Sequence, residues 1–299
     1  MVMDAGGLPL GGGEDAGPAT LAQAPREGWF TGAGGTSLFR RTWRSTGPSR
    51  AVLINLHGLG DHGGLYPALV EHFTGRGITV HAPDLRGNGR SAGRRGYIER
   101  WEEYREDLDR FVALVREEES DRPLFLLGNS LGGLIVLDYV QNRRPEGIRG
   151  VIVASPPLGR LGVPAPLMAL GRLMSRVWPS FSVRTGMDLT GLARDPAVVA
   201  TVLADPLFHR LGTARLSTEV VAAIARMHEA APGFPLPLLV LHGGKDRMVS
   251  PDGSRAFVPR VGHPDHELRE YPDAYHALFA DIGREQVLTD LERWIAARL

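Results

Sequence analysis

Five consecutive residues, Gly128-Asn129-Ser130-Leu131-Gly132, have the types and spacing of a catalytic turn. They follow an apolar run of strand length and precede a stretch with helical character. A serine hydroxyl is a weak nucleophile until a base takes its proton, and a sharp strand-to-helix turn with small flanking residues holds that hydroxyl above a sheet. A chance G-x-S-x-G is the alternative in a chain with 38 glycines. The position between a strand and a helix favours Ser130 as a nucleophile.

A serine at such a turn needs an acid and then a histidine later in the chain. Asp246 directly follows the apolar run 238–241, whereas Asp252 stands beside a proline and resembles a helix cap. Three histidines come after Asp246. His276 lies in a loop behind a predicted last strand, and His263 and His266 lie before or at the start of that strand. We therefore expect Asp246 and His276 to be the acid and the base.

Two backbone amides are candidates for the oxyanion hole. The amide of Leu131 stands at the start of the predicted helix, where N–H groups are free to face a developing negative charge. The loop "LHGLGDHGG" leaves an early strand and offers the amide of Leu59 as the second donor. We interpret His57 in that loop as a structural histidine below the site, without a catalytic step.

The rest of the chain predicts an α/β fold with a mostly parallel central sheet flanked by helices. Near-continuous apolar runs of strand length alternate with amphipathic helical stretches, which is typical of a parallel sheet covered on both faces. A two-stranded turn around Gly34 and Gly35 precedes them, and an amphipathic helix closes the chain. The predicted strands are residues 51–58, 78–84, 123–130, 150–155, 237–243 and 266–271.

Two segments depart from this alternation. Residues 1–27 are rich in Gly, Ala and Pro without apolar periodicity, and we interpret them as a disordered lead. Residues 157–232 show helical pieces and no clear strand, which predicts a helical cap inserted into a core formed by residues 28–156 and 233–299.

One cap helix carries an apolar stripe at helical spacing, formed by Leu167, Leu170, Met174, Val177 and Trp178, with Arg172, Ser175 and Arg176 toward another side. The stripe has two interpretations. It packs the cap onto the body, or part of it lines a tunnel above Ser130, with Leu170 and Met174 as candidate substrate contacts.

Composition excludes several classes of protein. The 299 residues hold 34 basic and 34 acidic side chains and no basic block, so we expect no nucleic-acid partner. Cysteine is absent, which rules out disulfides, thiolate nucleophiles and cysteine metal ligands. Histidines and carboxylates show no metal-binding spacing and no phosphate loop follows a strand, so we expect no metal and no other cofactor. Neither a membrane span nor a signal peptide is recognisable, and we expect a cytoplasmic protein.

Several blocks resemble the α/β-hydrolases of the monoacylglycerol lipase and lysophospholipase group: "HGLGDHGGLYPAL", "APDLRGNGRSAGRRGYIERWEEYREDLDRF", "GNSLGG", "LHGGKDRMVSP" and "YPDAYHALF". They occur in the family's order and cover most of the chain except the cap. The resemblance implies an α/β-hydrolase fold, a small lipid ester as substrate, and the same triad and oxyanion amides. It also suggests that the cap stripe lines a tunnel for the acyl chain, with Leu170 and Met174 as contacts, or touches the surface of lipid aggregates with its arginines at the headgroups. It departs at Asn129 and Asn88, where the family often carries histidine. It leaves the oligomeric state open.

Other reactions occur on the same scaffold. Epoxide hydrolases and haloalkane dehalogenases need an aspartate at the turn, where this chain has serine. A proline-preferring aminopeptidase shares the serine and the cap and stays open as an alternative. A non-catalytic binding protein is a third interpretation, although such proteins normally have a damaged triad.

Overall fold

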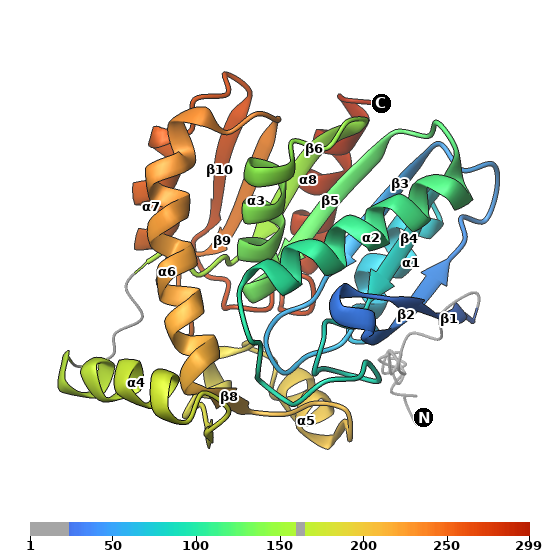
Figure 1. Ribbon diagram of the computed structural model, residues 1–299. Helices are drawn as coiled ribbons and strands as arrows, with labels where there is room; N and C mark the ends of the chain where they lie inside the picture. The colour runs from blue at the N-terminus through green and yellow to red at the C-terminus, as the bar shows by residue number, and fades with distance from the viewer. Residues whose placement is uncertain (1–23, 160–164) are drawn as a thin grey trace, which may run out of the picture.

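The computed structural model describes residues 24–159 and 165–299, built around a twisted eight-stranded sheet (Figure 1). The spatial order of the strands is β1 (Arg26–Thr31), β2 (Ser37–Trp43), β4 (Ile78–Pro83), β3 (Ala51–Leu56), β5 (Leu124–Asn129), β6 (Ile148–Ala154), β9 (Leu238–Gly243) and β10 (His266–Tyr271). Pairing is antiparallel between β1 and β2 and between β2 and β4, and parallel from β4 to β10. The predicted mostly parallel sheet is confirmed.

Helices cover both faces of the sheet because its central strands are apolar on both sides. The apolar cluster on one face includes side chains of α1 (Pro67–Thr74) and α8 (Arg284–Ala296). The cluster on the other face includes side chains of α2 (Glu102–Glu119), α3 (Leu131–Arg143), α6 (Ala214–Ala230) and α7 (Asp252–Phe257). The parallel strands thereby end at one common edge, where the loops after them meet.

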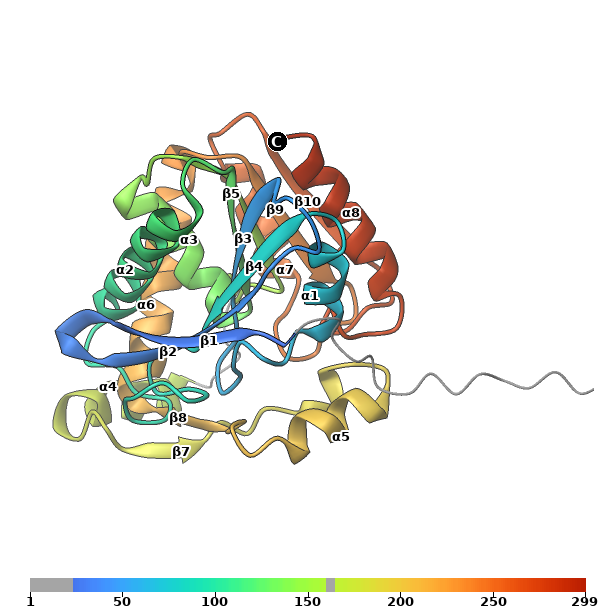
Figure 2. The same ribbon diagram turned by 90° about the vertical axis from the view of Figure 1, so that its right-hand side faces the viewer.

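Most of the insertion lies at one end of the sheet, at the bottom of Figures 1 and 2, and its last helix runs from there up along the body. It contains α4 (Ala165–Val177), β7 (Ser182–Arg184), α5 (Pro196–Ala204), β8 (Leu211–Thr213) and α6. It is mainly helical, as expected, but β7 and β8 form a small antiparallel pair that we did not predict. Each of these strands has three residues, too few for a visible alternation.

The predicted disordered lead falls almost wholly in residues 1–23, outside the described residues, as do residues 160–164 of the predicted cap. The prediction that the disordered lead extends to residue 27 was wrong, because Arg26 and Glu27 already pair with β2. The first strand therefore begins at Arg26 rather than at Gly28.

Candidate active site

Ser130 is the single residue between β5 and α3. Its backbone has φ 50° and ψ −119°, a left-handed conformation that is rare for a residue with a side chain. Three backbone hydrogen bonds hold it there: Ser130 N donates to Ala154 O at 2.8 Å, and Ser130 O accepts from Gly133 N at 2.9 Å and from Leu134 N at 3.3 Å. The turn leaves the serine half-exposed above the sheet, as a nucleophile requires.

The glycines around this turn are explained by close backbone contacts. A Cβ atom on Gly128 would lie 2.4 Å from Gly132 O, and one on Gly132 would lie 2.5 Å from the carbonyl oxygens of Leu56 and His57. A Cβ atom on Gly58 would come within 3.2 Å of Ser130 Cβ. The loop after β3 therefore runs directly beside the candidate nucleophile.

Asp246 and His276 are hydrogen-bonded to each other. Asp246 follows β9 and His276 follows β10, and His276 Nδ1 lies 2.7 Å from Asp246 Oδ2. The Asp246 carboxylate is buried and the His276 ring is only 10% exposed. This bond fixes the imidazole and leaves its Nε2 available to a hydroxyl group.

The carboxylate of Asp246 has further partners. Its Oδ1 accepts from the amides of Met248 and Val249 at 2.8 and 2.9 Å, and His242 Nε2 lies 3.4 Å from its Oδ2. Burial by itself would raise the pKa of Asp246, but the hydrogen bonds from His242, His276 and Val249 and the charge of His276 outweigh it and hold the pKa well below its usual range. The acid is thus kept ionised.

The backbone of His276 is held by both the body and the cap. Ser155, which follows β6 with φ 48°, donates from its hydroxyl to His276 O at 2.9 Å. In the cap, Gly191 O accepts from His276 N at 3.3 Å. We did not single out Ser155 or His242 from the sequence, because only the folded sheet brings their side chains to this loop.

Ser130 and His276 share the same sheet edge. Ser130 N is bonded to Ala154 O, and the next residue, Ser155, is bonded to His276 O. Within the described part of the chain the Ser130 hydroxyl makes no hydrogen bond of its own. Bonds between nucleophile and base are often loose before substrate binds, so this geometry is compatible with a triad.

The two candidate oxyanion donors are both unpaired. The amides of Leu59 and Leu131 donate to no acceptor among residues 24–159 and 165–299. His57 is fully buried, accepts from Leu85 N at Nε2 (2.8 Å) and donates from Nδ1 to Gly58 O (2.7 Å). Because the Gly58 carbonyl and the Leu59 amide belong to one planar peptide, His57 fixes the direction of that amide. The interpretation of His57 as structural agrees with these bonds.

The rejected histidines lie at the other end of the last strand. His266 begins β10, and its Nδ1 lies 2.6 Å from His263 O. Asp252 lies in the first turn of α7, where it pairs with Arg255. Asn129 stands where the family often has histidine, and its Nδ2 donates to Asn55 Oδ1 at 2.8 Å.

The stripe on α4 does not pack onto the body as one interpretation expected. Leu170 is 52% exposed and Met174 is half-buried, while Ser175 is buried and its hydroxyl lies 2.9 Å from Thr218 Oγ1 of α6. The packing interpretation is therefore wrong for most of the stripe. Helix α4 meets α6 through the side on which Ser175 lies.

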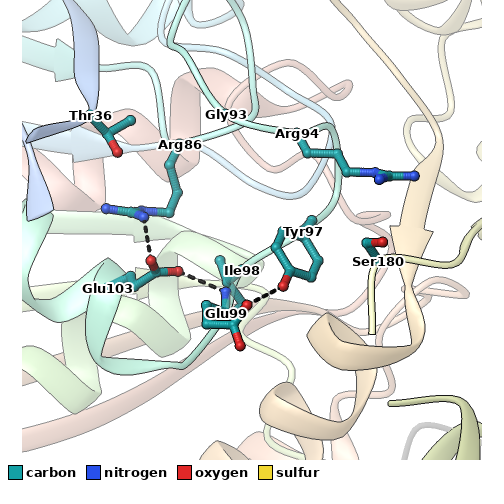
Figure 3. Close-up of a pocket in the computed structure, with 9 residues that line it drawn as sticks. All are labelled: Thr36, Arg86, Gly93, Arg94, Tyr97, Ile98, Glu99, Glu103 and Ser180. Carbon is teal, nitrogen blue, oxygen red and sulfur yellow. Dashed lines mark hydrogen bonds and ion pairs between the residues drawn. The ribbon is translucent and has the colours of Figure 1, made fainter. Parts of the chain in front are cut away.

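A separate cavity of about 340 Å³ opens where the loop after β4 meets the cap (Figure 3). No triad residue lines it. Its wall includes Arg86, whose guanidinium is held by Glu103 at 2.9 Å and by Asp107 at 2.6 Å, so the charge is already neutralised. Across residues 24–159 and 165–299, no cluster of three or more His, Cys, Asp or Glu side chains could hold a metal ion.

A mostly parallel sheet with these loops at its carboxyl edge is the α/β-hydrolase fold, and the chain is a serine hydrolase of that fold. A family model described as serine aminopeptidase, S33, matches residues 47–283. The chain belongs to this family, in the group of serine ester hydrolases that includes the monoacylglycerol lipases.

Individual relatives cover nearly the whole chain. A monoacylglycerol lipase of Mycolicibacterium smegmatis is 32% identical over 90% of this chain and 96% of its own length. A phospholipase of Bacillus subtilis is 30% identical over 82% and 95%. The crystal structure of Paleococcus ferrophilus monoacylglycerol lipase superposes with a TM-score of 0.80 at 32% identity, covering 88% of this chain and 99% of the other.

None of the helices in the described ranges combines the length and the apolar character needed to cross a bilayer.

Proposed function

We propose that the protein hydrolyses monoacylglycerols through an acyl-enzyme on Ser130. The observation that carries the proposal is the 2.7 Å bond from His276 Nδ1 to Asp246 Oδ2, on the sheet edge where the strained turn presents Ser130. Relatives with the name monoacylglycerol lipase over nearly their full length support the substrate class.

The residues supply a two-step ester hydrolysis. His276 Nε2 takes the Ser130 proton, Oγ attacks the ester carbonyl, and the amides of Leu59 and Leu131 receive the oxyanion. The protonated imidazole, stabilised by ionised Asp246, gives its proton to the leaving glycerol oxygen. Water then attacks the acyl-enzyme with His276 again as base, and the fatty acid leaves from Ser130.

A substrate panel tests this proposal. Purified protein is given monoacylglycerol, diacylglycerol, lysophospholipid and a proline nitroanilide, and kcat/KM is measured for each. We expect the highest value for monoacylglycerol and no turnover by Ser130→Ala. Preference for the proline anilide would favour the aminopeptidase that the family description names. Failure of a fluorophosphonate to label Ser130 would favour a non-catalytic binding protein.

We further propose that α4 and β7 contact the surface of lipid aggregates. Large apolar side chains are exposed on this part of the cap: Leu167, Leu170, Leu173, Val177, Trp178, Phe181 and Val183. The largest of them, Trp178, is 56% exposed. Exposed Arg172, Arg176 and Arg184 stand among them. An apolar patch beside arginines is the pattern that favours binding to anionic lipid surfaces.

Vesicle binding tests the lipid contact. Leu173→Ser should weaken co-sedimentation with vesicles of phosphatidylcholine and phosphatidylglycerol while hydrolysis of nitrophenyl butyrate stays unchanged. Leu203→Ser is the matched control, because Leu203 is equally exposed on α5, away from this patch. Equal binding by both variants would contradict the proposal.

Two finer assignments belong to the same proposal. Half-buried Met174 is the better candidate for an acyl contact, and half-exposed Leu170 the better candidate for a lipid contact. A cytoplasmic location remains a prediction from the sequence, to be checked by fractionation.

A further inference from the structure

Gly60, directly after the candidate oxyanion donor Leu59, is held by hydrogen bonds on both of its backbone groups. Its N–H donates to Asn88 Oδ1 at 3.0 Å, and its carbonyl accepts from the amide of His209 at 2.9 Å. Asn88 lies in the loop after β4, and His209 lies in the cap between α5 and β8. The loop that carries the Leu59 amide is therefore joined to the body and to the cap at one residue.

The Asn88 side chain has little freedom. It is fully buried, its Oδ1 receives Gly60 N and His209 Nε2, each at 3.0 Å, and its Nδ2 donates to Arg86 O at 2.9 Å. Arg86 is in turn anchored by Glu103 and Asp107, as Figure 3 shows for the pair with Glu103. Because three hydrogen bonds hold this buried amide, a displacement of His209 is expected to shift the Asn88 side chain and, through it, Gly60 N.

The His209 ring has a defined tautomer. Its Nδ1 accepts from Leu211 N at 3.2 Å, so the proton is on Nε2, which faces Asn88 Oδ1 and Gly87 O. Burial and the charge of Arg95 lower the pKa of His209 to about 4, which keeps the ring neutral at neutral pH. The neutral ring is the form that these bonds require.

The cap approaches the loop as closely as backbone allows. Gly60 has φ 77°, and a Cβ atom on it would lie 1.9 Å from His209 O. Close by, His62 Nε2 donates to Asp205 Oδ2 of the cap at 3.0 Å. Cap residues 205–211 are thus seated directly on the loop after β3.

We propose that Asn88 and His209 are positioning residues that couple the seating of the cap to the Leu59 amide. His57 fixes the peptide before Leu59 N, and Asn88 with His209 fixes the peptide after it. With both neighbours held, the amide has one direction, and oxyanion stabilisation depends steeply on that direction. The inference rests on the proposed function, because it takes Leu59 as an oxyanion donor.

Steady-state kinetics on nitrophenyl butyrate give the first measurement. We expect His209→Phe and Asn88→Leu to lower kcat by about 10- to 100-fold with a smaller change in KM. His209→Gln, whose amide can still donate to Asn88, should recover most of the loss.

His228→Phe is the matched control. His228 is also a half-buried cap histidine, and its Nε2 bonds Leu158 O of the body at 2.7 Å, but it does not touch the loop after β3. This variant should keep kcat within about twofold if the effect of His209 is specific to positioning.

Inhibitor binding separates positioning from general loosening. A trifluoromethyl ketone forms a tetrahedral adduct with an oxyanion, whereas the corresponding trifluoromethyl alcohol binds without one. The ratio of their inhibition constants should move toward one in His209→Phe and Asn88→Leu by about the same factor as kcat, and should stay unchanged in His228→Phe.

Unchanged kcat and an unchanged inhibitor ratio in His209→Phe would overturn the inference, as would an equal loss in His228→Phe. If Asn88→Leu does not fold, His209→Phe and His209→Gln decide. Failure of the proposed function looks different, since Ser130→Ala would then stay active and the ketone would bind no better than the alcohol to the wild-type protein.

Discussion

Asp246 is bonded more extensively than a carboxylate that only orients one imidazole. Two backbone amides hold its Oδ1, and His276 and His242 lie near its Oδ2. Each donor favours the ionised form, which is the form that the proposed mechanism needs to stabilise a His276 imidazolium. His242 is thus a supporting residue for the acid, a role that its place before Asp246 in the chain did not suggest.

The candidate triad makes a prediction at this scale. Ser130→Ala and His276→Ala should each lower kcat on nitrophenyl butyrate by on the order of 10³- to 10⁶-fold, and the double variant should be little worse than either. The three residues act as one unit, so a second loss removes little that remains. Thermal unfolding should stay close to wild type. Losses that multiply in the double variant would contradict the assignment.

At the scale of elements, the turn between β5 and α3 depends on backbone-to-backbone contact. Gly132 is the second residue of α3, and the carbonyls of Leu56 and His57 occupy the space that a side chain would need. Only glycine lets α3 start this close to the end of β3, where the loop with Leu59 begins.

Substitution of two helical glycines tests this contact. Gly132→Ala should destabilise the protein by about 1 to 3 kcal/mol and reduce kcat, because a Cβ atom 2.5 Å from two carbonyl oxygens forces the turn to move. Gly171→Ala on α4 should be neutral or stabilising by up to about 1 kcal/mol, since nothing lies within 4 Å of that position. Urea unfolding measures both, and equal effects would contradict the explanation.

Five of the six parallel core strands were predictable because each is a short apolar run, whereas β10 is a mostly polar strand at the edge of the sheet. The predicted run 266–271 coincides with β10, and the other five core strands agree within a few residues at their ends. Ser130, Asp246 and His276 were chosen as candidates by a rule of chain order, which needs only the positions of strands, and the structure brings Asp246 and His276 into hydrogen-bond contact. The interpretation of α4 failed in part because its periodicity shows that a stripe exists but not what covers it.

Contacts between distant segments could not be predicted. His209 and Asn88 are 121 residues apart in the chain, and neither has a local pattern that points to the other. Ser155 likewise reaches His276 across 121 residues. Such pairs follow from how the cap folds back onto the sheet edge, which depends on packing rather than on local propensity.

At the scale of the whole molecule, the cap is attached to both halves of the site. Its residues 189–194 hold the loop of His276: Gly191 O accepts from His276 N, and Arg194 pairs with Asp281 at 3.0 Å. Its residues 205–213 hold the loop of Leu59 through His209 and Asp205. Helix α4 lies outside both attachments, at the lower left of Figure 1. Its large apolar side chains Leu167, Leu170 and Leu173 are exposed. One insertion therefore combines a part that is hydrogen-bonded to the loops of the candidate site with a helix whose apolar side chains are exposed.

Buried histidines make the stability of this assembly depend on pH. Burial lowers the pKa of His57 and of His81, and burial with the charge of Arg95 lowers that of His209 to about 4. Unfolded histidine titrates near about 6.5, so between that pH and the folded pKa the unfolded chain binds more protons than the folded protein does. The free energy of unfolding should therefore fall as the pH is lowered from about 6.5 to about 4.

His209→Gln isolates one share of this pH dependence. The variant removes a group that is neutral when folded and protonated when unfolded, so the slope of unfolding free energy between about pH 6.5 and 4 should become shallower. Because His209 is only half-buried, solvent screening reduces its share to about 1 kcal/mol. The depressed pKa of Asp246 acts in a different window, since its stabilisation is complete above about pH 4 and is lost only below it. Urea unfolding at a series of pH values measures the slopes, and an identical slope in the variant and the wild type would show that the folded protein does not hold His209 neutral in this pH range.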